Sequence, residues 1–81
     1  MDRTARMYSR AKAVFAKLER KLLRKHTGQF VAVEPISRDF VVGTDEVNVA
    51  LKARRRHPGK LFGFFRVGSP AVHKMRRVGS C

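Results

Sequence analysis

The hydrophobic positions near the start of the chain recur at helical spacing. Between Arg3 and Lys25 apolar side chains return every three or four residues, at Met7, Ala11, Val14, Phe15, Leu18 and Leu22. No glycine or proline interrupts the segment before Thr27-Gly28. This period is typical of an amphipathic helix with one buried stripe. The sequence therefore predicts one long helix, roughly 35 Å in length at about 1.5 Å per residue.

After Gly28 the pattern changes to short runs of β-branched and aromatic residues. Two such runs occupy residues 29–34 and 39–43, and a polar turn from Pro35 to Arg38 lies between them. Runs of this length, bounded by turn residues, are typical of strands. The sequence therefore predicts a β-hairpin after the long helix.

A short helix is predicted to follow the hairpin. Val47, Ala50 and Leu51 have the spacing i, i+3, i+4 of one helical face. Thr44 is the expected N-cap because its hydroxyl can accept a hydrogen bond from the first turn. His57-Pro58-Gly59 is expected to end this helix.

The run from Lys60 to Val67 predicts a third strand, which Gly68-Ser69-Pro70 ends. Both faces of this strand are apolar, so the sheet needs a cover on each side. We expect the short helix to cover one face. The long helix, a second copy of the chain or a ligand covers the other. Residues 71–81 are expected to form a tail with at most a turn or two of helix.

The predicted fold class is α+β, in the order α-β-β-α-β, with a long N-terminal basic amphipathic helix and a basic C-terminal tail. We divide the 81 residues into the helix at 1–27, a small ββαβ domain at 28–70 and the tail at 71–81. Folding of a chain this short buries only about two-thirds of its surface. A deep substrate cleft is therefore not expected.

Charge is the most informative feature of the composition. The chain holds 19 Lys and Arg against 6 Asp and Glu, for a formal net charge of +13. Residues 1–27 have a net charge of +7, residues 28–50 of −3, and residues 51–81 of +9. Two cationic segments thus enclose a mildly acidic one, and this asymmetry favours a polyanionic partner.

We therefore predict a small basic protein that binds nucleic acid, RNA or DNA, by contacting the phosphate backbone as a ribosome-associated, nucleoprotein or regulatory component. At 100° per residue, most cations of the long helix fall on one side of its apolar stripe. The predicted binding residues are Arg3, Arg6, Arg10, Lys17, Arg20, Lys21, Arg24, Arg54, Arg55, Arg56, Lys60, Arg66, Lys74, Arg76 and Arg77.

Other interpretations of the basic segments remain open. The cations can form a solvated outer face, or the basic helix can lie on an anionic membrane surface. The alternative function is a protein-interaction module that docks an acidic protein partner, as an antitoxin-like or adaptor protein or as a small subunit of a larger assembly. A homodimer is also compatible with the sequence.

The third predicted strand shares four residues with the aromatic strand motif of RNA-recognition domains, namely Lys60, Phe62, Gly63 and Phe64. In such domains alternate aromatic rings stack on bases. Phe62 and Phe64 could therefore form a stacking surface with Arg66 beside it. We favour the other interpretation, in which both rings pack in the core under the long helix.

Three further segments resemble a family of very small uncharacterised prokaryotic domains. Gly28-Gln-Phe-Val-Ala-Val33 is similar to the family's first strand, Val42-Gly43-Thr44 to its turn into a helix, and Phe65-Arg-Val-Gly68 to its closing strand. The resemblance covers residues 28 to about 70. It implies an antitoxin-like or adaptor role and carries over no catalytic residues. The long cationic helix and the arginine-rich tail depart from the pattern.

Candidate catalytic and metal-binding residues are few. His26, His57 and His73 are far apart in the sequence and lack acids or cysteines at metal-ligand spacing. Cys81, the single cysteine, is the last residue, so no intramolecular disulfide is expected. We predict a non-enzyme with no cofactor, no metal site and no membrane span, located in the cytoplasm.

Overall fold

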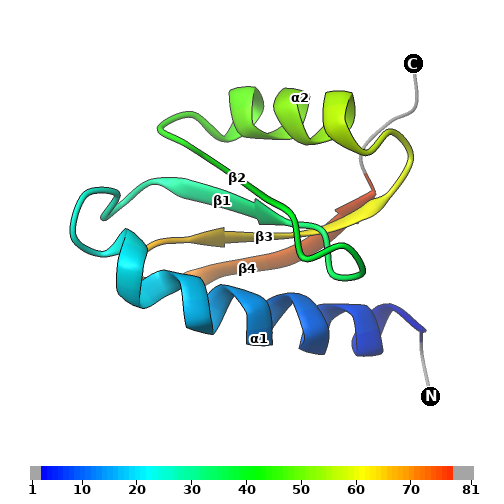
Figure 1. Cartoon of the computed structure of the whole chain (residues 1–81), viewed down its shortest axis with the longest axis horizontal. Coiled ribbons are helices and arrows are strands. Elements are labelled where there is room, and N and C mark those ends of the chain that lie inside the picture. The colour runs from blue at the N-terminus through cyan, green and yellow to red at the C-terminus, as the bar shows by residue number, and fades with distance from the viewer. Residues whose placement is uncertain (1–2, 78–81) are drawn as a thin grey trace.

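The computed structural model describes residues 3–77, except for the side chains of residues 3, 4 and 69–74, and confirms the α+β class. Its elements are α1 (Arg3–Leu22), β1 (Phe30–Val33), β2 (Phe40–Gly43), α2 (Glu46–Arg56), β3 (Leu61–Arg66) and β4 (Ser69–Arg77). The strands form one antiparallel sheet in the order β2-β1-β3-β4. The two helices cover opposite faces of this sheet (Figure 1).

The predicted long helix is confirmed, although it ends at Leu22 and a turn follows. The N–H of His26 donates to the carbonyl of Leu22 (2.7 Å). Gly28 then reverses the chain with a φ of 84°, a backbone conformation that glycine adopts without steric cost. Its N–H donates to the carbonyl of Val67 (2.9 Å), which places the start of β1 beside the end of β3.

The hairpin and the short helix also form where the sequence predicts them. The N-cap of α2, however, is Asp45 and not Thr44. Asp45 Oδ1 accepts a hydrogen bond from the N–H of Val47 (3.2 Å). Aspartate is as good an N-cap as threonine, and its negative charge also suits the positive end of the helix dipole.

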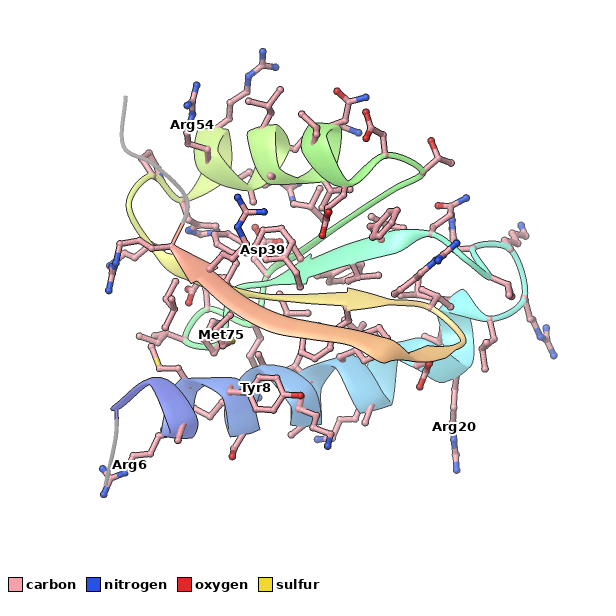
Figure 2. The ribbon with its side chains drawn as sticks, turned by 180° about the vertical axis from the view of Figure 1, so that it is seen from behind. Arg6, Tyr8, Arg20, Asp39, Arg54 and Met75 are labelled. Carbon is pink, nitrogen blue, oxygen red and sulfur yellow. The ribbon has the colours of Figure 1, made fainter. Side chains whose placement is uncertain are left out.

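The expected basic tail is wrong, since residues 69–77 form the fourth strand. Gly68, with a φ of 81°, turns the chain back so that β4 pairs with β3 and Met75 lies opposite Gly63. Met75 points toward α1 (Figure 2) and packs against the core on that side. The spacing of Val72, Met75 and Val78 is typical of a helix, but the open edge of β3 favours a strand here, because its backbone groups gain hydrogen-bond partners from β4. Val78 lies outside the described residues.

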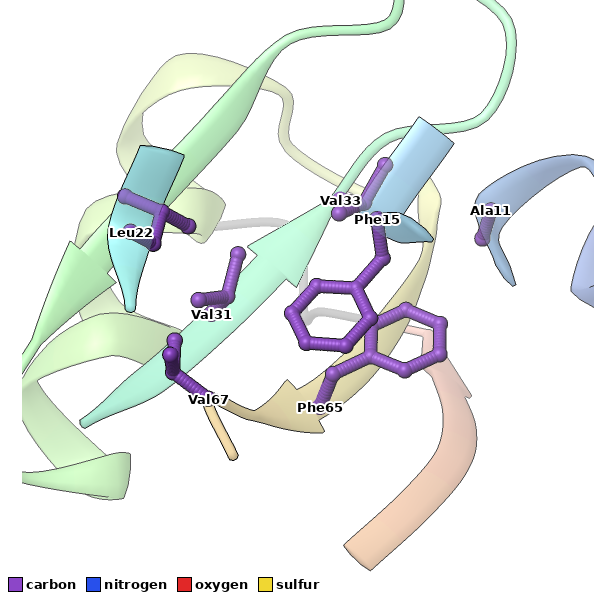
Figure 3. Close-up of a cluster of buried hydrophobic side chains, with 7 residues drawn as sticks. All are labelled: Ala11, Phe15, Leu22, Val31, Val33, Phe65 and Val67. Carbon is purple, nitrogen blue, oxygen red and sulfur yellow. The ribbon is translucent and has the colours of Figure 1, made fainter. Parts of the chain in front are cut away.

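The core between α1 and the sheet contains Ala11, Phe15, Leu22, Val31, Val33, Phe65 and Val67 (Figure 3). The rings of Phe15 and Phe65 stack with centroids 4.6 Å apart and planes 7° from parallel. Ala11 lies over Gly63 so closely that a Cβ on the glycine would be 2.7 Å from the Ala11 Cβ. The small side chains at this crossing let the helix approach the sheet closely.

A second core lies between α2 and the sheet and contains Phe62 and Phe64, which are 0% and 2% exposed. Burial of both rings confirms the core interpretation. Their position under the long helix, in contrast, is wrong, because they pack against Val49 and Ala53 of α2. Alternate side chains of a strand point to opposite faces, so Phe65 faces α1 when Phe62 and Phe64 face α2.

Within residues 3–77, neither helix combines the length and the hydropathy that crossing a bilayer requires.

Candidate nucleic-acid interface

Four cations of α1, together with Arg24 in the turn that follows it, form one exposed band, which we name the α1 cationic flank. Its members are Arg6, Arg10, Lys17, Lys21 and Arg24. Arg20 lies further round the helix and points away from the sheet, as Arg6 does (Figure 2). In the part of the chain described, no hydrogen bond or ion pair joins the flank to an acidic side chain. The flank therefore presents unneutralised charge to solvent.

Backbone hydrogen bonds explain why acids do not neutralise these cations. Glu19 accepts from the N–H of Gly68 (3.0 Å), and Asp45 caps α2. The Glu34 carboxylate accepts from two N–H groups of the β1–β2 turn, those of residues 36 and 37, both at 2.9 Å. Charge-assisted bonds of this kind stabilise turns and helix ends. Glu19, Glu34 and Asp45 thus bind backbone N–H groups of the fold and none of the flank cations.

A groove of about 450 Å³ runs between the flank and the β1–β2 turn. Arg10 and Lys17 line one side, and Arg38 lines the other. Its floor is apolar, formed by the side chains of Ala13, Val14, Leu18, Pro35 and Ile36. The groove therefore combines an apolar base with three cations. Two of the cations come from α1, and the third, Arg38, comes from the β1–β2 turn.

Arg38 was missed by the sequence prediction. It is the single Lys or Arg within residues 28–50. Four acids in the same segment give it a net charge of −3, so the segment does not stand out as basic. Its φ of 66° is the one positive φ among non-glycine residues 3–77. The hydrogen bond from its N–H to the carbonyl of Glu34 (2.8 Å) holds that conformation. Periodicity carries no signal for such a turn, so the charge-based search could not find this residue.

Burial alone raises the pKa of Glu34, but hydrogen bonds from the N–H groups of Ile36 and Ser37 outweigh it, and the pKa lies below its ordinary value. A lowered carboxyl pKa means that ionisation stabilises the folded state above the ordinary pKa and that this contribution disappears as the pH falls through the folded pKa. We therefore expect Glu34→Gln to cost about 1–3 kcal/mol at neutral pH, since a buried carboxylate that accepts two bonds is replaced. The measurement is the free energy of unfolding in urea.

The difference between wild type and Glu34→Gln should shrink as the pH falls from the ordinary glutamate pKa of about 4.3 through the lower pKa of folded Glu34. Ile36→Ala provides the comparison because it changes an exposed side chain and leaves the backbone N–H bond from residue 36 to Glu34 in place. A difference that stays constant from neutral to acid pH would contradict this role of the ionised carboxylate.

Asp39 ties the end of α2 to the start of β2. Arg56 Nη1 donates to Asp39 Oδ1 (3.1 Å) and to the carbonyl of Phe40 (3.1 Å), and His57 Nε2 lies 3.0 Å from Asp39 Oδ2. Burial raises the pKa of Asp39, but the hydrogen bonds from His57 and the Phe40 N–H outweigh it and lower the pKa. Arg56 thus already has a structural role at this corner.

The structure does not gather the predicted binding residues on one surface. Arg54, Arg76 and Arg77 line a groove between α2 and β4, on the opposite face of the sheet from α1. Arg55 and Arg56 lie on the side of α2 next to β2. Arg66 lies over the Phe30 ring, 5.4 Å from its centroid, and Lys60 is exposed after α2. The side chains of Arg3 and Lys74 lie outside the described part.

Comparison with models of protein families, with characterised proteins and with solved structures finds no match to this chain. The resemblance of residues 28 to about 70 to small prokaryotic domains therefore stays a prediction.

Proposed function

We propose that this chain binds nucleic acid, RNA or DNA, through phosphate contacts made by the α1 cationic flank and Arg38. The observation that carries the proposal is the flank itself, a row of exposed cations without acidic partners among residues 3–77. Like charges at i and i+4 destabilise an isolated helix slightly. A phosphate backbone beside them removes this repulsion and releases its own counterions.

The length of the flank sets the expected number of contacts. Arg6 and Lys21, the first and last cations of the flank within α1, are 15 residues apart, so along the helix they span roughly 22 Å. Each strand of duplex DNA advances about 3.4 Å along the axis per phosphate. The flank therefore spans roughly six phosphates of one strand, from which we derive the salt dependence below.

The burial of the aromatic rings supports binding without sequence recognition. Phe62 and Phe64 lie inside the core under α2 and offer no stacking surface. Arginine and lysine contacts to phosphate position a protein but do not distinguish bases. We therefore propose that affinity changes little between nucleic acids of different sequence.

The salt dependence of binding tests this proposal. With about six phosphates neutralised, the logarithm of the association constant should fall against the logarithm of the salt concentration with a slope near −5 for duplex DNA and −4 for a single strand. Arg10→Gln combined with Lys17→Gln should flatten the duplex slope by about 2. Adding Arg38→Gln should flatten it by about 1 more. Fluorescence anisotropy of a labelled oligonucleotide measures each slope.

The matched control combines Lys12→Gln with Lys52→Gln. It removes the same charge from exposed positions away from the flank, and we expect the slope to stay near the wild-type value. An equal change in both double variants would show that the charge acts diffusely. A wild-type slope near zero, or no binding at low salt, would reject nucleic acid as the partner.

A further inference from the structure

The groove between α2 and β4 lies on the face of the sheet opposite the α1 cationic flank. It has a volume of about 220 Å³ and an apolar lining of Val47, Ala50, Leu51 and Phe64. Leu51 is 42% exposed and Val47 64% exposed, and both are among the exposed large apolar side chains in the described part of the chain. The groove therefore exposes apolar surface beside a folded core.

The position of α2 explains why this surface is open. Four strands at about 4.8 Å spacing make a sheet roughly 19 Å wide, and one helix is about 10 Å across. The backbone of α2 packs over β2 and β1, toward one edge of the sheet. Among residues 3–77, no helix lies above the half of this face that contains β4, and Figure 1 shows α2 on this side of the sheet.

The sequence of α2 carries two helical stripes. Val49 and Ala53 are fully buried against the sheet. The second stripe, formed by Val47, Ala50, Leu51 and Arg54, lines the groove with the spacing i, i+3, i+4, i+7. This spacing presents one face of a helix to another helix packed beside it.

The charges of the groove are mainly positive. Arg54, Arg76 and Arg77 contribute three positive charges and Glu46 one negative charge, for a net +2. Arg54 Nε is buried and has no hydrogen-bond partner in the described part of the chain. A buried donor without a partner is costly, and a carboxylate entering the groove could accept from it. The Arg76 guanidinium lies 5.8 Å from the centroid of the Phe64 ring, at the edge of the apolar lining.

We propose that this groove docks an amphipathic acidic helix of a partner protein. The apolar side chains of this helix pack on Val47, Ala50 and Leu51, and its carboxylates bind Arg54 and Arg76. Such a helix lies beside α2 and covers the open half of the sheet, as amphipathic helices do in other apolar grooves. A second copy of this chain is disfavoured, because each copy carries a net charge of +13. Nucleic acid is disfavoured because an aliphatic stripe offers phosphates and base edges no hydrogen bonds.

The test uses a fluorescein-labelled helical peptide built from three repeats of Leu-Glu-Glu-Leu-Leu-Glu-Glu, titrated with the full chain. We expect saturable binding by anisotropy, and amide NMR shifts centred on residues 47–54 and on Phe64. Leu51→Glu should weaken the binding at least about tenfold, as the loss of an interface anchor does. The matched control is Leu23→Glu. It introduces the same charge at a leucine of nearly equal exposure, 44%, in the turn after α1, and should weaken binding less than about twofold, because an exposed residue outside the interface adds little to affinity.

Three results would overturn the proposal. One is the absence of binding up to the solubility limit of the peptide. Another is equal binding of a peptide with lysine in place of every glutamate, since charge would then play no part. The third is a loss of oligonucleotide affinity in Leu51→Glu that is as large as the loss of peptide affinity. The groove would then belong to the nucleic-acid surface. Binding to the oligonucleotide by the α1 cationic flank is measured separately, so either proposal can fail alone.

Discussion

Phe65→Ala is expected to lower the free energy of unfolding by about 3–5 kcal/mol, the usual cost of removing a fully buried phenylalanine. Phe65 is 0% exposed and its ring stacks on Phe15. Tyr8 stacks on it as well, with centroids 6.2 Å apart. The neighbouring Gly63 has no side chain that could move into the space left behind. Since small domains are stable by only about 5–15 kcal/mol, much of the protein could unfold.

Urea unfolding followed by far-UV circular dichroism measures this loss. Phe65→Leu serves as the control, because it keeps most of the apolar volume and should cost distinctly less than the alanine variant. Ile36→Ala changes an exposed apolar residue and should alter stability by less than about 0.5 kcal/mol. A loss below about 1 kcal/mol for Phe65→Ala would mean that α1 does not pack on the sheet as described.

Gly63→Val is expected to be the second most damaging substitution, at about 3 kcal/mol, near the upper end of the cost of overpacking a core. A Cβ on Gly63 would lie 2.7 Å from the Cβ of Ala11 and 2.8 Å from the Phe65 ring. Neither neighbour can move away easily. The Cβ of Ala11 is bonded directly to the backbone of α1, and the Phe65 ring stacks on Phe15. The branched side chain must therefore push α1 away from the sheet.

A double-mutant cycle between Gly63→Ala and Ala11→Gly tests this close approach. Ala11→Gly alone should cost about 1 kcal/mol through the helix propensity of glycine. In the Gly63→Ala background it also removes the clashing Cβ. We therefore expect the double variant to be at least about 0.5 kcal/mol more stable than the two single losses added together. Strict additivity, measured by urea unfolding, would show that the two Cβ positions do not meet.

The elements that follow from local periodicity could be predicted. The helical stripe from Met7 to Leu22, the hairpin around Pro35 and the existence of α2 all depend on neighbours in the sequence. The buried stripe of α2 is an exception, because Val49 and Ala53 face the sheet and the predicted Val47 and Leu51 are exposed. The fourth strand could not be predicted in this way. Its formation depends on the open edge of β3, which is a tertiary feature, whereas the spacing of Val72 and Met75 fits a helix. Local pattern and sheet pairing conflict there, and the pairing prevails.

The candidate sites divide in the same way. The exposed cations of α1 follow from the helical period alone, and so does their position beside the apolar stripe. Arg38 reaches the same groove because a turn with a positive φ places it there. The close approach of α1 to the sheet depends on Gly63, whose missing side chain admits Ala11. The position of Arg38 and the contact of Ala11 with Gly63 leave no periodic signal in the sequence.

The order β2-β1-β3-β4 has a consequence for the kinetics of folding. The hairpins β1–β2 and β3–β4 are local, but the central pairing of β1 with β3 brings Phe30 beside Arg66. Hairpins form in about 1–10 μs, whereas contacts distant in sequence must first overcome the entropy of closing a long loop. We therefore expect the docking of two preformed hairpins to limit the folding rate. Substitutions at Ala32 in β1, which lies opposite Phe64 of β3, should slow folding more than they accelerate unfolding.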